Sequence, residues 1–176
     1  MPKIIENVHG LLVDEAKRQI REEGYDSVTI RSIARECGIG LGTFYNYFKS
    51  KDMLIASFLL DDWKARIDKV KNENEGQSDP MVVVRSIHNE LKEFIESNIS
   101  IFTSASAIKS FNSTAGNYHK MLRAQIAEPI FAACVKGGYE DAEFLSEFVA
   151  EAILTWTVAK KDYSQIESVI AKLFAQ

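Results

Sequence analysis

The stretch "CGIGLGTFYNYFKSK", residues 37–51, decides the fold of this chain. It places three glycines within residues 38–42 and then four aromatic side chains within residues 44–48. The run that overlaps its start, "TIRSIARECG" at residues 29–38, has apolar side chains at the i, i+3, i+4 and i+7 spacing of a short helix. Thr29 suits the N-cap of that helix, and Gly38 suits its C-terminal left-handed position. Two short helices joined by a tight glycine turn form the helix-turn-helix pattern.

The glycines and aromatics take separate roles if the second of these helices enters the major groove of DNA. Gly40 and Gly42 bracket its start, where bulk would hold the backbone away from the groove. Phe44 and Phe48, four residues apart, form a packing face. Thr43, Tyr45 and Tyr47 offer hydroxyl groups that can bond phosphates or bases, and Lys49 and Lys51 add ammonium groups at the start of the next helix. A tight turn with core aromatics would explain the glycines and tyrosines alone, but the order of the features favours DNA binding.

The composition narrows the class of protein. The chain has 176 residues, an ordinary apolar fraction of 46% and a net charge of −4, which together fit a globular protein of one or two domains. Its acidic excess lies after Lys51, whereas residues 28–51 are locally positive. Two distant cysteines favour neither a disulfide framework nor a zinc site. No run is long and apolar enough to span a bilayer or to act as a secretory peptide, so we expect a cytoplasmic protein.

Helical periodicity continues on both sides of the helix-turn-helix. Apolar residues from Ile5 to Ile20 recur three or four apart and predict a first helix that ends at Gly24. Ser50 suits the cap of a long fourth helix. The apolar face of that helix is formed by Leu54, Phe58, Leu59, Trp63, Ile67 and Val70.

The remainder of the chain also predicts helices. The polar segment "NENEGQSDP", residues 72–80, predicts a loop, and periodic apolar runs follow it to the C-terminus. Pro129 falls inside one such run and predicts a kink or break near Ala127. No segment shows the alternation of a strand, so the predicted fold class is all-α. We expect a DNA-binding domain at 1–51 and a helical effector-binding and dimerisation domain at 52–176.

The segment "TIRSIARECGIGLGTFYNYFKSKDML", residues 29–54, resembles the helix-turn-helix signature of TetR/AcrR-type transcriptional regulators. The resemblance extends from Leu12 to about Leu54, and a match this long is far more specific than a general helix-turn-helix pattern. Three positions depart from the family pattern. Gly40 stands where a capping residue is usual, Glu15 at a commonly small position, and Ile20 at a common aromatic position.

The resemblance implies a set of DNA contacts. The residues that would face the bases are Arg31, Leu41, Gly42, Tyr45 and Asn46. Those that would hold phosphates are Thr29, Thr43, Tyr47, Lys49 and Lys51. Because Leu41 can touch a thymine methyl group but cannot form a bidentate bond, Arg31 and Asn46 are the better prospects for hydrogen-bonded readout.

The second part of the chain carries weaker signals. The resemblance implies that the last two helices, about 141–161 and 164–175, pair with their copies in a homodimer. Their apolar content exceeds what one surface helix needs, although a single core could also absorb it. A two-fold protein matches a two-fold operator, which favours the dimer.

A small-molecule site in this part would be mostly apolar. Its predicted lining residues are Phe94, Phe102, Phe111, Tyr118, Met121, Leu122 and Trp156. Core packing is the alternative explanation for each of them. The run 97–116 is rich in Ser and Thr, which predicts an irregular segment near the mouth of the site, or a loop. The scattered histidines and the absence of nucleotide or hydrolase motifs predict no metal, no cofactor and no catalysis.

The preferred hypothesis is a ligand-responsive transcriptional repressor that binds a pseudo-palindromic DNA operator as a homodimer and is released by a small-molecule effector. The alternative is a helical small-molecule-binding protein or enzyme in which the helix-turn-helix is only scaffold. A regulator that recruits another protein without an effector is a third possibility that the sequence does not separate.

Overall fold

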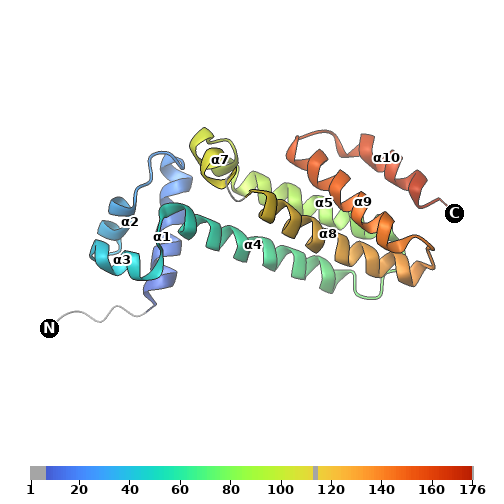
Figure 1. The fold of residues 1–176 in the computed structure, drawn as a ribbon, viewed down its shortest axis with the longest axis horizontal. Coiled ribbons are helices and arrows are strands. Elements are labelled where there is room, and N and C mark those ends of the chain that lie inside the picture. The colour runs from blue at the N-terminus through green and yellow to red at the C-terminus, as the bar shows by residue number, and fades with distance from the viewer. Residues whose placement is uncertain (1–6, 113–114, 176) are drawn as a thin grey trace. The chain divides into compact units, whose positions relative to one another are not determined.

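The computed structural model describes residues 7–112 and 115–175, with the side chains of 110–112 and 115–118 excepted, and it confirms the all-α prediction over that part of the chain. Figure 1 shows the helices in chain order. Their bounds are α1 (Val8–Glu23), α2 (Ile30–Glu36), α3 (Leu41–Tyr47), α4 (Lys51–Glu73), α5 (Pro80–Ser97), α6 (Ile99–Phe102), α7 (Ala105–Asn112), α8 (Ala115–Gly137), α9 (Ala142–Val158) and α10 (Tyr163–Leu173).

The chain forms two compact units that differ from the two predicted ranges. The first unit joins residues 1–62 to residues 98–113, and the second joins 63–97 to 114–176. The first segment of the first unit therefore ends at Asp62, inside α4 and eleven residues beyond Lys51. The segment that starts at Asn98 also belongs to the first unit. The functional boundary at Lys51 stays a prediction.

The first unit has one apolar core, built from α1 to α4 together with α6 and α7. Leu12, Ile33, Phe44 and Leu54 are fully buried in it. Ile101 and Ala107 from the Ser- and Thr-rich run are buried in the same core. The expectation that this run is irregular or a loop is therefore wrong for 99–102 and 105–112, because burial of these apolar side chains stabilises helices whose intrinsic propensity is modest.

Several helix ends follow the predicted local chemistry. Thr29 caps α2 in a reciprocal capping box with Ser32, and Gly38 after α2 has φ +66°. The Ser50 hydroxyl accepts a hydrogen bond from the Met53 amide at 3.1 Å and so caps α4. Thr43, a predicted DNA-contact residue, is the third residue of α3, which begins at Leu41.

In the second unit α5, α8 and α9 pack against one another, and α10 covers α9 and α5 (Figure 1). The helix that begins at Pro80 ends at Ser97. Pro129 lies inside α8, which continues to Gly137, so the expected interruption near Ala127 is not a break, and the alternative of a kink stays a prediction. Within the described residues, no helix is both long and apolar enough to cross a membrane.

Candidate nucleic-acid interface

Helix α3 has one buried face and one exposed face. Phe44 is fully buried, and its ring lies 6.2 Å from that of Phe48, so these two side chains anchor the helix in the core of the first unit, as predicted. The side chains of Leu41, Tyr45 and Tyr47 are about two fifths to one half exposed. Gly42 and Asn46 are exposed as well. The predicted base-facing residues of α3 therefore share its exposed side.

The first turn of α2 carries two further predicted contact residues. Thr29 and Arg31 are both exposed. The Thr29 hydroxyl is engaged locally, because its oxygen accepts from the Ser32 amide at 3.0 Å and lies 3.2 Å from the Ser32 hydroxyl. This cap keeps the start of α2 in place, and Arg31 projects from the turn that it stabilises.

The two lysines beyond α3 differ in their surroundings. Lys49 is exposed, and its ammonium group donates to the Tyr45 carbonyl at 3.3 Å. Lys51 is half-buried, and its ammonium group donates to the carbonyls of Tyr25 at 3.0 Å and Val28 at 3.1 Å. It also lies 3.9 Å from the centre of the Tyr25 ring. Burial lowers the pKa of Lys51, and the nearby carboxylates of Asp52 and Asp26 oppose this shift.

Sequence reasoning missed the role of the loop between α1 and α2. The Tyr25 hydroxyl donates to Asp52 at the start of α4, and Asp26 accepts hydrogen bonds from Ser104 and Ser106 beside α7. The hydrogen bond from Ser106 and, after it, the one from Ser104 hold the pKa of Asp26 below its usual range. Because the partners are 27 to 80 residues apart in the chain, no local pattern indicates these bonds.

Gly40 occupies the N-cap of α3 without a side chain to fill that role. No side-chain hydrogen bond caps the helix at this end. Gly40 has φ −75° and ψ 154°, which any L-residue can adopt, and a Cβ added there would meet no atom within 4 Å. The structure thus confirms that α3 lacks the usual capping side chain at Gly40. The backbone conformation at Gly40 does not require a glycine.

The predicted effector-site residues are dispersed between the two units. Phe102, 39% exposed, belongs to the first unit, whereas Phe94, Met121, Leu122 and Trp156 belong to the second. Phe94 packs in the core with its ring 5.5 Å from that of Trp63. The Trp156 ring nitrogen donates to the Asp162 carbonyl at 2.8 Å. The side chains of Phe111 and Tyr118 lie outside the described residues.

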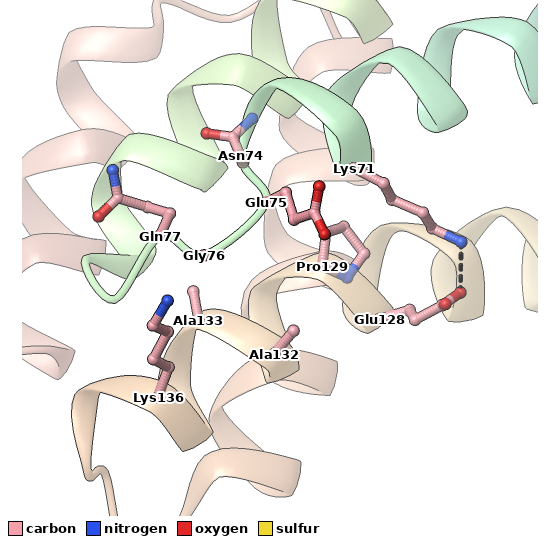
Figure 2. Close-up of a pocket in the computed structure, with 10 residues that line it drawn as sticks. All are labelled: Lys71, Asn74, Glu75, Gly76, Gln77, Glu128, Pro129, Ala132, Ala133 and Lys136. Atoms are coloured by element: carbon pink, nitrogen blue, oxygen red, sulfur yellow. Dashed lines mark hydrogen bonds and ion pairs between the residues drawn. The ribbon is translucent and has the colours of Figure 1, made fainter.

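A pocket of about 270 Å³ in the second unit lies where the end of α4 and the following loop meet α8 (Figure 2). Lys71 and Glu128 form an ion pair of 2.7 Å at its edge, and Lys136, Gly76 and Pro129 also line it. None of the predicted effector-site residues whose side chains the structure describes lines this pocket. Its charged groups, which include Lys71, Glu128 and Lys136, differ from the mostly apolar site that was expected.

The last two helices present apolar side chains to solvent. On α9 the exposed residues are Phe144, Phe148 and Val158, and on α10 they are Val169 and Leu173. The rings of Phe144 and Phe148 stack at 6.0 Å. Other members of the predicted set, including Leu154 and Ile170, are buried within the second unit. Packing in a single core therefore explains the buried apolar residues of α9 and α10. It does not explain the exposed ones.

Comparison with known proteins places the first unit in a family. Residues 12–58 match the family model of bacterial regulatory proteins, tetR family. The HTH-type transcriptional regulator YuxN of Bacillus subtilis is 35% identical over 68 residues, which are 37% of this chain and 23% of YuxN. The chain therefore spans about a quarter of that relative's length.

Two comparisons extend over most of the chain. The fatty acid metabolism regulator protein of Bacillus subtilis is 23% identical over 88% of this chain and 86% of its own length. The crystal structure of the transcriptional regulator FadR from Bacillus subtilis, in complex with stearoyl-CoA, superimposes with a TM-score of 0.52 at 17% identity, covering 94% of this chain and 96% of that one. By their names both proteins are regulators, and the FadR structure shares the all-helical fold of this chain. With the exposed α3 face, the glycine turn and the family match, residues 12–58 belong to the tetR family of bacterial regulatory proteins.

Proposed function

We propose that this chain is a transcriptional repressor that binds a pseudo-palindromic DNA operator as a homodimer and is released by a small-molecule effector. The exposed face of α3 carries the proposal. Its apolar anchor Phe44 is fully buried while Tyr45 and Asn46 beside it are exposed, which is the arrangement that a recognition helix needs. The rigid anchor holds the exposed side chains at a fixed depth in the groove.

The proposed contacts divide by chemistry. Arg31 and Asn46 read base edges through hydrogen bonds, and Leu41 covers a thymine methyl group, with Gly42 and Tyr45 beside them. Phosphate oxygens are held by Thr29, Thr43, Tyr47 and Lys49, and by the one N–H of Lys51 that its two carbonyl bonds leave over. Only the first group carries sequence information.

The homodimer proposal is supported by the exposed apolar side chains of α9 and α10. Phe144 is 67% exposed and Phe148 is 50% exposed, and burying large aromatic side chains against a second copy removes apolar area from water. A two-fold dimer presents two α3 helices to two half-sites, so each base contact is made twice.

The effector proposal concerns the second unit. The stearoyl-CoA in the related FadR structure makes long-chain acyl-CoA the first class of effector to test here. An effector releases the operator only if it binds the non-binding conformation more tightly than the binding one, because equal affinity for both shifts nothing.

Selection of bound duplexes from a random DNA pool tests the proposed function. We expect one two-fold sequence to be enriched, and Asn46→Ala to relax its base preference. Lys49→Ala should weaken binding to all duplexes and lower the salt slope by about 0.9 for each phosphate contact that is lost. Lys64→Ala, an exposed lysine of the second unit, is the matched control. Absence of any enriched sequence would refute the proposal, and retention of the operator at saturating stearoyl-CoA would refute the acyl-CoA class.

A further inference from the structure

Gln19 is a polar side chain in the apolar core of the first unit. It lies on α1 and is only 2% exposed, next to the buried Ala16 and Ile20. Burying a primary amide without hydrogen bonds is unfavourable, because the amide loses its bonds to water. Here both ends of the amide are paired. The amide nitrogen donates to Glu15 Oε1 at 2.6 Å, and the amide oxygen accepts from the Ser32 hydroxyl at 2.7 Å.

The bond to Ser32 links α1 to the first turn of α2. Ser32 is the residue that completes the capping box of α2, where its hydroxyl oxygen accepts from the Thr29 amide at 3.1 Å. Arg31 is exposed on this same turn, and α2 is followed by the glycine turn that leads into α3. A side chain that fixes the first turn of α2 therefore fixes the start of the helix-turn-helix.

Glu15 fixes Gln19 from the other side. The Glu15 carboxylate accepts from the Arg18 guanidinium at 2.6 and 2.9 Å, and these bonds lower the pKa of Glu15 despite its partial burial. A charged, oriented acceptor then receives the Gln19 amide. The bond from Gln19 explains Glu15, one of the three departures from the family pattern, because Glu15 is the acceptor for the buried Gln19 amide.

We propose that Gln19 is a positioning residue that sets the rotation of α2 against α1 and thereby the placement of Arg31 and α3 for base readout. The inference rests on the proposed function. Apolar contacts between the helices are not directional, whereas the two hydrogen bonds of Gln19 have narrow geometry. Misplacement of α2 weakens contacts to base edges, which depend on register, more than the long-range attraction to phosphates, which does not.

The test uses Gln19→Met, which keeps the side-chain length and removes both bonds. Binding of the full chain to its selected operator and to a scrambled duplex is measured by fluorescence anisotropy over a salt series. We expect operator affinity to fall about tenfold, with affinity for the scrambled duplex and the salt slope unchanged. Ile55→Val, a buried change on α4 in the same unit, is the control that lowers thermal stability and leaves the operator-to-scrambled ratio unchanged.

Glu15→Ala keeps Gln19 and removes its orienting partner, so it carries the test if Gln19→Met fails to fold. It should lower the ratio of operator to scrambled affinity by a smaller factor. The double variant should add nothing to Gln19→Met, because both substitutions act on the bond between Gln19 and Ser32. A ratio unchanged in the folded variants, or equal losses on both duplexes, would overturn the positioning role. If the unaltered chain selects no operator, the proposed function itself fails, and that outcome is seen before any variant is made.

Discussion

Replacing Gly40 with serine should stabilise the protein, because α3 begins at a position that is ready for a cap and has none. The backbone there is already extended, with φ −75° and ψ 154°, and a Cβ would meet open space. A serine hydroxyl at this position can accept a hydrogen bond from the amide of Gly42 or Thr43, which are the second and third residues of the helix.

Two contributions set the magnitude. Serine improves on glycine at an N-cap by a few tenths of a kcal/mol. Loss of the backbone freedom of glycine in the unfolded chain adds about 0.4–1 kcal/mol at a compatible conformation. The expected gain is therefore about 1 kcal/mol in the free energy of unfolding, or about 2–4 °C in the melting temperature for a chain of this length.

Chemical denaturation of the full chain, followed by circular dichroism, measures this gain. Hydrogen exchange should slow in the first turn of α3, including the Phe44 amide, which donates to the Gly40 carbonyl at 3.2 Å. Gly38→Ser is the matched control: with φ +66° it should destabilise by about 1–2 kcal/mol. If Gly40→Ser leaves the free energy of unfolding unchanged or lowers it, while Gly38→Ser destabilises as expected, the reasoning from the open cap is wrong.

Three further outcomes are expected. Lys51→Met should lower the free energy of unfolding by about 2 kcal/mol in urea titrations, because two loop carbonyls lose a charged donor, whereas Lys49→Met should change it by less than about 0.5 kcal/mol; equal effects would contradict a stabilising role of the two Lys51 hydrogen bonds. Because the folded-state pKa of Asp26 lies below its unfolded value, its contribution is complete above about pH 4 and is lost as the pH falls further. Melting temperatures of Asp26→Asn should accordingly fall less steeply between pH 5 and pH 2 (roughly the acid range of carboxylates), and parallel curves would refute this. Phe148→Glu should convert a dimer to a monomer in sedimentation velocity, and a persisting dimer would place the interface elsewhere.

Local chemistry made the helix-turn-helix predictable. Gly38 has the positive φ that its position after α2 predicted, Thr29 forms the expected cap, and Phe44 and Phe48 lie on the packing face that their spacing indicated. Each of these features depends on residues within four positions of one another. Local patterns did not indicate which compact unit a residue joins: Phe94 and Phe102 share a residue type but belong to different units. Their role in an effector site stays a prediction.

The amino-acid sequence alone determined the all-α class, the family and the division of α3 into an anchored and an exposed face, because helix periodicity, capping and glycine turns are short-range effects. Only the tertiary structure decided that residues 98–112 join the core of the DNA-binding unit through Ile101 and Ala107. It alone paired Gln19 with Ser32 and engaged Lys51 with the loop carbonyls. These hydrogen bonds join residues 13 to 26 positions apart, and burial and hydrogen bonding at such separations depend on how the whole chain packs.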